Sequence, residues 1–327
     1  MADRSSLLAA KLRALVGAPD AEPAVFPGGA ALVAGPSAWL LLDVDPLISL
    51  GPALVWASRR DATDVTLLID RDAGVIARRA ALFSSPPTVL AVEGTSLVPA
   101  APAPTPVPVD APSAPGLAEL LVDADLEVVV EDGIVRGEVR GLEVARIVHG
   151  TTTSGTPIDE PVLEVGVGEA DREMTALVHA GLPPFDQLVR VRDIVLEHRR
   201  PDAERHPLNQ LAPERWLRAT LVRDPSRVGC VELHPAPPAV PRANLRDPAV
   251  AMARGRDRSG AEVIVACSVG VHLDLVPAAA DARATLAPDA RLLLVLPERD
   301  AHAVTSALAA RLLQPADLVP LAGDWRT

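Results

Sequence analysis

The chain has 327 residues, 49% of them hydrophobic, and a formal net charge of −12 at pH 7. This length exceeds what one core usually serves, so two or three domains are expected. Lysine occurs once, at Lys11. Lys11 lies on a predicted N-terminal surface helix, which excludes P-loop, Schiff-base and protein-kinase chemistry, because each of these needs a lysine at its reacting centre. The acidic charge disfavours nonspecific nucleic-acid binding, which depends on neutralising phosphates.

The N-terminus lacks the sustained apolar core and cleavage site of a signal peptide. No apolar stretch reaches the roughly 18 residues of a membrane span. The two cysteines, Cys230 and Cys267, lie far apart, and Cys267 is predicted to be a buried, inert strand residue. We therefore expect a cytoplasmic protein without a membrane segment.

Secondary-structure signals in the first part of the chain alternate between strands and helices. Residues 5–17 have apolar positions at helical spacing, and Gly17 provides a stop signal. Residues 30–34 and 39–43 are predicted strands on either side of a turn. A helix at 50–60, a strand at 65–69, a helix at 74–83 and a strand at 88–92 follow. Apolar strands that alternate with helices indicate an α/β layer with parallel pairing.

A proline-rich linker is predicted at residues 98–115, where proline recurs at nearly every second position. Such spacing blocks helices and strand pairing and favours an extended spacer over a peptide ligand for SH3-type domains.

The middle of the chain has the pattern of an α+β domain. It comprises a predicted helix at 116–122, strands at 126–130, 134–140, 142–148 and 161–167, and helices at 169–180, 185–198 and 213–222. Apolar and charged residues alternate over 135–140, which predicts a sheet with one solvent-facing side. Pro213 suits the first turn of its helix.

The last part of the chain repeats the order of the first. A second proline-rich connection spans 229–248, and a hairpin follows with strands at 249–253 and 262–267 around a turn at 255–260. A helix within 271–286 leads to a strand, helix and strand within 291–321. An alignment that matches Pro87 with Pro315 also places Arg71-Asp72-Ala73 on Arg299-Asp300-Ala301. The shared order and spacing indicate an internal duplication.

The predicted fold is therefore α/β, with two similar hairpin-α-β-α-β modules at the N- and C-termini and an α+β middle domain. The predicted boundaries are 1–97 for the first module, 98–115 for the linker, 116–228 for the middle domain, 229–248 for the second connection and 249–327 for the last module.

The last module, AVAMARGRDRSGAEVIVACSVG followed by helix, strand, helix and strand, resembles the core of restriction-endonuclease-like proteins of the PD-(D/E)xK class. In that family the hairpin carries an aspartate and an acid-x-lysine pair, which hold a divalent metal and activate water for phosphodiester cleavage. Here residues 266–269, where the acid-x-lysine pair falls, contain neither carboxylate nor lysine. The first module keeps Asp43 and Asp45 but no lysine. The resemblance implies a nuclease-like fold that has lost its catalytic motif. The segment LAPERWLR (211–218) also resembles unassigned actinobacterial proteins, to which no activity attaches.

Two groups of carboxylates are candidate metal ligands. Asp43 and Asp45 lie at the end of a predicted strand and point to one side of it. Glu164 and Asp171 flank the start of a predicted helix, with His179 two turns further on. A solvated turn and a capped helix start are the alternative interpretations, because a hard cation needs several oxygen ligands.

The most arginine-rich stretch is the candidate binding surface. It contains Arg199, Arg200, Arg215, Trp216 and Arg218. Arginine forks grip carboxylates and phosphates, and a tryptophan between arginines is typical of a contact hot spot. The alternative is an exposed helical region whose arginines pair with nearby glutamates.

These observations favour a non-catalytic interaction or scaffold protein, with no catalytic residue and no cofactor, that binds a protein partner or associates with itself. Nucleic acid is not favoured as a partner. One alternative is a metal-dependent hydrolase or nuclease acting on nucleic acid, with Mg²⁺ as its cofactor. Another is a regulatory protein that binds a small anion at Arg199 and Arg215.

Overall fold

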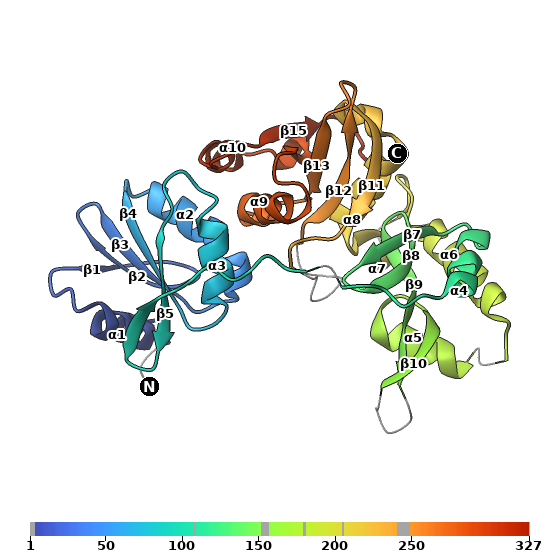
Figure 1. Ribbon diagram of the computed structural model, residues 1–327, viewed down its shortest axis with the longest axis horizontal. Coiled ribbons are helices and arrows are strands. Elements are labelled where there is room, and N and C mark those ends of the chain that lie inside the picture. Colours follow the sequence, from blue (N-terminus) through green and yellow to red (C-terminus); the bar gives the residue numbers. More distant parts are fainter. Residues whose placement is uncertain are drawn as a thin grey trace. The chain divides into compact units, whose positions relative to one another are not determined.

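The computed structural model describes residues 4–107, 109–151, 157–178, 181–204, 206–240 and 249–326. Contacts divide the chain into two compact units (Figure 1). The first unit contains residues 1–105, 273–288 and 301–318, and the second contains 106–272, 289–300 and 319–327. The C-terminal segment therefore contributes to both units, whereas the sequence predicted one module over 249–327.

The first unit is built on a six-stranded sheet in the order β1-β2-β3-β4-β5-β6. Its strands are β1 (Glu22–Ala24), β2 (Gly29–Ala34), β3 (Ser37–Leu42), β4 (Asp64–Ile69), β5 (Thr88–Glu93) and β6 (Ser96–Pro99). Strands β3, β4 and β5 are parallel, and the remaining pairs are antiparallel. The predicted hairpin and parallel strands are confirmed. The edge strands β1 and β6 were not predicted, because such short segments that include a proline show no alternation.

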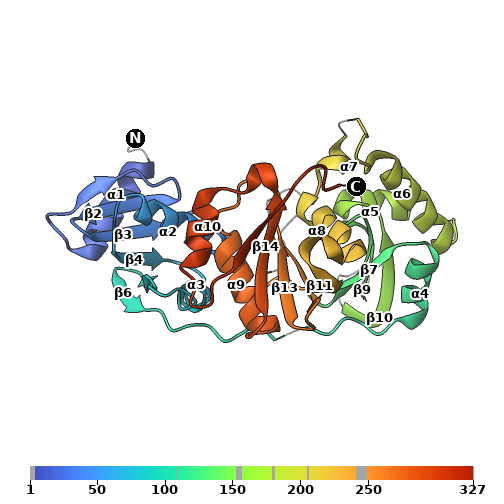
Figure 2. The same ribbon diagram turned by 90° about the horizontal axis from the view of Figure 1, so that it is seen from above.

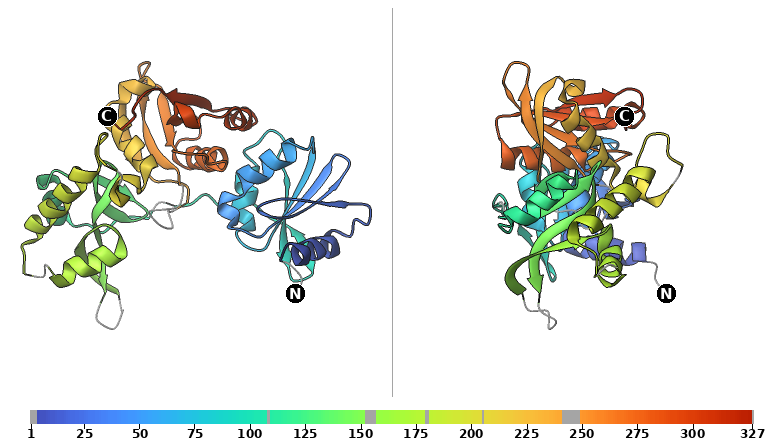
Figure 3. Two further views of the ribbon diagram at one scale, coloured as in Figure 1. Left: turned by 180° about the vertical axis from the view of Figure 1, so that it is seen from behind. Right: turned by 90° about the vertical axis from the view of Figure 1, so that its right-hand side faces the viewer.

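Helices cover both faces of this sheet (Figures 1 and 3). They are α1 (Arg4–Val16), the short 3₁₀ helix η1 (Pro46–Ile48), α2 (Leu50–Ser58) and α3 (Ala73–Ala80). Two further helices of the unit, α9 (Leu275–Leu286) and α10 (Ala303–Ala310), pack on α2 and α3. On one face, Leu12 of α1 packs in a cluster with Leu32 and Leu41. The right-handed crossovers of β3-α2-β4-α3-β5 place α2 and α3 together on the other face. Helix α2 is apolar nearly all round, which is typical of a helix enclosed between two layers.

The two repeats meet across a local two-fold axis. Phe83 and Leu312 form an antiparallel bridge. Beside it, Ser84 N donates to Arg311 O at 2.9 Å, and Leu313 N donates to Leu82 O at 2.9 Å. An alignment of the two repeats that makes Phe83 equivalent to Leu312 interchanges these two bonds. Equivalent residues therefore face each other, as they do in an isologous dimer interface.

The helices have the same two-fold symmetry. Helix α2 is equivalent to α9 and α3 to α10, and α2 packs on α10 as α9 packs on α3. The alignment predicted from the sequence is thus out of register by a single position at this point. It matched Pro87 with Pro315, whereas the bridge makes Pro86 the equivalent of Pro315.

The second unit contains the middle domain, whose four-stranded antiparallel sheet has the order β10-β9-β8-β7. Its strands are β7 (Glu127–Glu131), β8 (Ile134–Val139), β9 (Leu142–Thr151) and β10 (Pro157–Val165). Its helices are α4 (Pro115–Asp123), α5 (Gly168–Val178), α6 (Pro184–His198), α7 (Pro207–Gln210) and α8 (Pro213–Arg223), with η2 (Pro225–Val228) after α8. Leu121 of α4 and Leu188 of α6 pack with Val135 and Ile147 in one core on a face of the sheet. The predicted strands and helices of this domain are confirmed over the described residues, which exclude 179 and 180 of the predicted helix 169–180. The short α7 was not predicted.

The five-stranded sheet has the order β11-β12-β13-β14-β15. Its strands are β11 (Cys230–Ala236), β12 (Ala251–Asp257), β13 (Glu262–Cys267), β14 (Arg291–Pro297) and β15 (Asp317–Leu321), and η3 (Glu298–Asp300) follows β14. The prediction of a proline-rich connection at 229–248 is wrong for β11, which tolerates Pro235 because it is an edge strand. Residues 241–248 lie outside the described residues. Trp216, Leu217 and Leu221 of α8 pack against this sheet (Figure 2).

The structure is a mixed α/β protein with related strand and helix orders at its two ends, as predicted. The described residues of the predicted linker between β6 and α4, 100–107 and 109–114, form neither helix nor strand. The first part of the linker is attached to the first unit, because Ala103 N donates to Gly74 O at 2.8 Å. Among the described helices, none combines the length and the apolar character that a membrane crossing needs.

Candidate functional site

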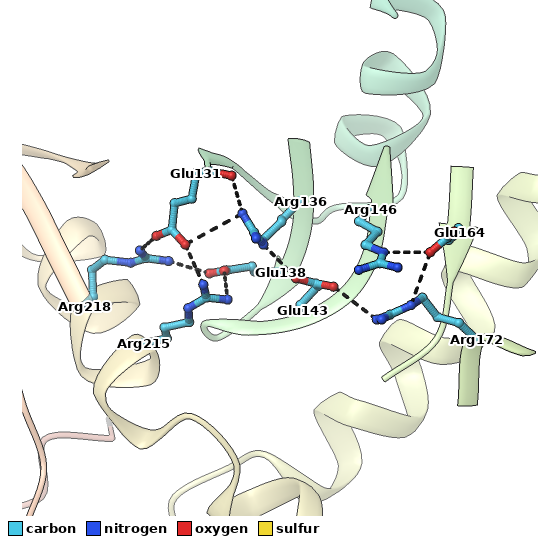
Figure 4. A network of polar contacts seen from close by, with 9 residues as sticks. All are labelled: Glu131, Arg136, Glu138, Glu143, Arg146, Glu164, Arg172, Arg215 and Arg218. Carbon is cyan, nitrogen blue, oxygen red and sulfur yellow. Dashed lines mark hydrogen bonds and ion pairs between the residues drawn. The ribbon is translucent and has the colours of Figure 1, made fainter. Parts of the chain in front are cut away.

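One face of the four-stranded sheet is charged, and every strand contributes to it (Figure 4). The six side chains are Glu131, Arg136, Glu138, Glu143, Arg146 and Glu164. Arg172 of α5 and Arg215 and Arg218 of α8 lie over them. The sequence correctly predicted which face of the sheet is charged. The prediction that this face is exposed to solvent is wrong, because α5 and α8 cover it.

The buried end of this network joins two glutamates to two arginines. Glu131 contacts Arg215 at 2.5 Å and also Arg218. Glu138 contacts Arg215 at 3.3 Å and Arg218 at 2.8 Å. Every one of these side chains is at least nine-tenths buried. Burial alone lowers the pKa of Arg218, but Glu138 and Glu131 reverse this effect and raise it. Although burial opposes it, the same pairing lowers the pKa of Glu131, so both groups stay charged at neutral pH.

A close backbone approach positions α8 against the sheet. The turn between β8 and β9 has positive φ at Arg140 (47°) and Gly141 (73°), as a two-residue hairpin turn requires. A Cβ at Gly141 would lie 2.2 Å from the backbone of Arg215. Glycine at this turn therefore lets the first turn of α8 reach the sheet.

The other end of the network opens to solvent. Arg136 contacts Glu143 at 2.7 Å, and Glu143 contacts Arg172 at 3.2 Å. Arg172 and Arg146 then share Glu164, at 3.4 Å and 2.7 Å. A cavity of about 330 Å³ lies beside these last three residues, between β10 and α5. Burial, followed by the nearby charge of Arg146, lowers the pKa of Arg172.

Arg199 is fully buried, and its guanidinium binds backbone carbonyl oxygens. It donates to the carbonyl oxygens of Arg140, Leu208, Leu211 and Ala212 at 2.7–3.1 Å. Its guanidinium also lies 4.6 Å from the centre of the Trp216 ring. Burial lowers the pKa of Arg199 to about 9, which leaves it protonated at neutral pH. Arg199 therefore fastens the end of α6 to the segment that leads into α8.

The predicted binding surface is corrected by these contacts. Arg199, Arg215, Trp216 and Arg218 are all buried, and only Arg200 is exposed. The sequence correctly predicted that these residues lie close together. Their predicted role as an exposed binding surface is wrong, because four of the five are buried. Arg215 and Arg218 are three residues apart and so share a helix face. Glu131 and Glu138 belong to one predicted hairpin, Glu131 at its turn and Glu138 on its second strand. These spacings were the available signal for the ion pairs.

The four predicted metal ligands each have another partner. Asp43 pairs with Arg4 at 2.6 Å, and Asp45 accepts from Leu47 N at 3.0 Å as the N-cap of η1. Glu164 pairs with Arg146 and Arg172, and Asp171 accepts from Val167 N at 2.6 Å. The two predicted pairs lie in different units.

Across the described ranges, no three His, Cys, Asp or Glu residues are arranged to hold a metal. His179 lies outside these ranges. Cys267 is completely buried, as predicted, and burial raises its thiol pKa to about 12.

Helix α8 also lines a groove that the sequence did not indicate. This groove, of about 350 Å³, is called the α8 groove below. It is lined by Glu127, Val128, Val129, Glu138, Arg218, Ala219, Val222, Arg223 and Pro235. Arg223 and Glu127 form a 3.2 Å pair at the groove, and both side chains are partly exposed. Burial, then the charge of Glu138, raises the pKa of Glu127.

Strand β7, one wall of the α8 groove, differs from the other edge strands of the three sheets. Of the six edges, β1, β6, β10, β11 and β15 each contain a proline, and β7 does not. Proline protects an edge because it cannot donate to an added strand. Val128 and Val130 of β7 are exposed.

Comparison with protein-family models, with curated proteins and with solved structures gives no match for this chain.

Proposed function

We propose that this protein is a non-catalytic interaction protein that holds a protein partner at the α8 groove. The observation that carries the proposal is that the predicted ligand-binding side chains contact other groups of the same chain. The four predicted metal ligands and Arg199, Arg215 and Arg218 are engaged within the chain, in ion pairs and in hydrogen bonds to the backbone. Their geometry supports a structural role.

The α8 groove has the composition of a docking site. Val128, Val129, Ala219 and Val222 supply apolar contact area, and the Arg223–Glu127 pair supplies polar contacts at its margin. Protein interfaces combine such an apolar centre with a polar rim. A partner segment with one apolar side chain for the groove, flanked by polar residues, suits it. The rigid floor, fixed by the pairs of Arg218, lowers the ordering cost of binding.

Site-specific photocrosslinking in cells tests the docking site. A photoreactive residue replaces Val128 in the groove or, as a control, the exposed Val25 of the first unit. We expect one discrete crosslinked protein from position 128 and none from position 25. Equal crosslinking at the two positions would contradict a specific site on α8.

Calorimetric titration with Mg²⁺ and Mn²⁺ tests the alternative of a metal-dependent hydrolase. We expect no saturable binding, and no difference between the native chain and Asp43→Ala or Glu164→Ala. Millimolar or tighter binding that either substitution abolishes would support the hydrolase and exclude the present proposal.

A further inference from the structure

A cavity of the first unit lies at the end of α2. Its volume is about 390 Å³. It is lined by Leu54, Ser58, Asp61, Ala62, Thr63, Val65, Ser84, Ser85, Pro86, Pro87 and Arg311. The cavity thus lies between the last turn of α2, the start of β4 and the loop before β5, with Arg311 from the other repeat as one wall.

The C-terminal repeat shows what fills the equivalent position. Matching the first residues of α2 and α9, Leu50 and Leu275, makes Arg283 the equivalent of Ser58. The alignment at the two-fold axis makes Gln314 the equivalent of Ser85. Arg283 is 6% exposed, and its Nη2 donates to Gln314 O at 2.7 Å. An arginine side chain therefore spans from the helix end to the loop in one repeat.

Serine at the equivalent position leaves this space open in the N-terminal repeat. Ser58 is shorter than arginine by several atoms, and the cavity extends from it to Ser85. The backbone carbonyl of Ser85 corresponds to the one that accepts from Arg283. The two repeats thus have the same arrangement of helix end and loop carbonyl. Only the C-terminal repeat has an arginine side chain between them.

The walls of the cavity suit a guanidinium group. Asp61 supplies a carboxylate, and it is held on the wall by a left-handed backbone (φ 54°) in the turn that ends α2. Ser58, Thr63, Ser84 and Ser85 supply hydroxyl oxygens. A guanidinium pairs well with a carboxylate and with carbonyl oxygens, because its donors lie in one plane.

Arg311 gives the cavity a second charge of opposite sign. This residue lines the cavity, and its carbonyl oxygen accepts from Ser84 N and Ser84 Oγ at 2.9 and 3.0 Å. A ligand that carries both a guanidinium and a carboxylate satisfies Asp61 and Arg311 together, whereas a simple cation satisfies only the first.

We propose that this cavity binds a guanidino acid such as free arginine, with its guanidinium placed as that of Arg283 is placed in the other repeat. The site is independent of the α8 groove. It would allow the first unit, where the two repeats meet, to bind a small molecule.

Calorimetry on the full-length protein with three probes tests the proposal. L-Arginine should bind saturably, agmatine more weakly because it lacks the carboxylate, and citrulline at least tenfold more weakly because it lacks the charge. Ser58→Arg should abolish arginine binding while the protein stays folded, because the other repeat already accommodates arginine there. Ser96→Arg, on the exposed β6, is the matched control and should bind as the native chain does.

Asp61→Asn covers the case in which Ser58→Arg fails to fold, and it should weaken arginine binding at least tenfold. Arginine-containing peptides with blocked ends distinguish a peptide ligand from the free amino acid. Tighter binding of these peptides than of arginine would overturn the assignment to a free guanidino acid. Equal binding of citrulline and arginine, or unchanged binding by Asp61→Asn, would overturn the guanidinium site itself.

Discussion

Arg218 shows how a residue typical of binding sites becomes a structural residue. It is 1% exposed and pairs with Glu131 and Glu138, which are 2% and 1% exposed. Removing one partner from a buried ion pair leaves an uncompensated charge, which costs far more than the pair itself contributes. The residue types were readable in the sequence, but their burial was not, because it depends on α8 folding back over the sheet.

Arg218→Leu should lower the free energy of unfolding by about 3 kcal/mol, because Glu138 then pairs with Arg215 alone, and Glu131 keeps only Arg215 and the more distant Arg136 at 3.9 Å. Arg223→Leu, further along α8, is the control: its pair with Glu127 is exposed, and its loss should cost about 0.5 kcal/mol. Urea unfolding followed by circular dichroism measures both. Similar losses for the two variants would show that the buried network is not structural.

Asp274 is the clearest titrating group in the first unit. It is 1% exposed, accepts from Gly51 N at 2.9 Å, and lies 3.3 Å from Arg79, which also pairs with Asp281 at 3.1 Å. Burial raises the pKa of Asp274 to about 7, although Arg79 and the Gly51 N–H lower it. Arg78 pairs with Asp281, and the charge of Asp45 adds to the rise.

Stability should therefore fall with rising pH at this site. Between the unfolded pKa near 4 and the folded pKa, the folded state keeps a proton that the unfolded state has lost, so stability decreases up to about pH 7 and then levels off. Asp274→Asn removes this dependence. Between pH 5 and 8, native stability should decline relative to that of the variant, by on the order of 2 kcal/mol. Parallel pH profiles of the two proteins would disprove the shift.

At the scale of elements, the predicted strands and helices are largely present, because apolar periodicity and turn residues indicate local structure. The elements that were missed are edge strands, β1, β6 and β11, whose prolines hide the signal. The sequence could not predict that α2 packs beside α9, because this packing depends on a close backbone contact between distant segments. A Cβ at Gly51 of α2 would lie 2.0 Å from the carbonyl oxygen of Leu273, just before α9.

Gly51→Ala should therefore destabilise the protein by about 2 kcal/mol, even though alanine in a helix usually gains about 1 kcal/mol over glycine. Gly116→Ala, in α4, has no atom within 4 Å of the added Cβ and should be neutral or slightly stabilising. Thermal unfolding of the two variants compares them directly. If Gly51→Ala is as stable as Gly116→Ala, then α2 does not approach residue 273 so closely.

At the scale of the molecule, the two ends of the chain, which share an order of strands and helices, contact each other within the first unit. The shared order at the two ends could be read from the sequence, but the pairing of the ends could not, because residues 83 and 312 are separated by most of the chain. The repeats associate through α2, α3, α9 and α10 as two subunits would. The predicted boundary at 249 lies within residues 106–272 of the second unit, and the residues after 272 are divided between the two units.

A disulfide across the two-fold axis tests this pairing most directly. Ser84 and Arg311 lie opposite each other beside the Phe83–Leu312 bridge, and both native cysteines are buried. Opposed positions in an antiparallel pair have the Cα separation that a disulfide needs. Mild oxidation of Ser84→Cys/Arg311→Cys should give an intramolecular disulfide in nearly every molecule, detected by intact mass and by faster migration on a non-reducing gel. Free thiols or only intermolecular crosslinks after oxidation would contradict the pairing of the two repeats within one chain.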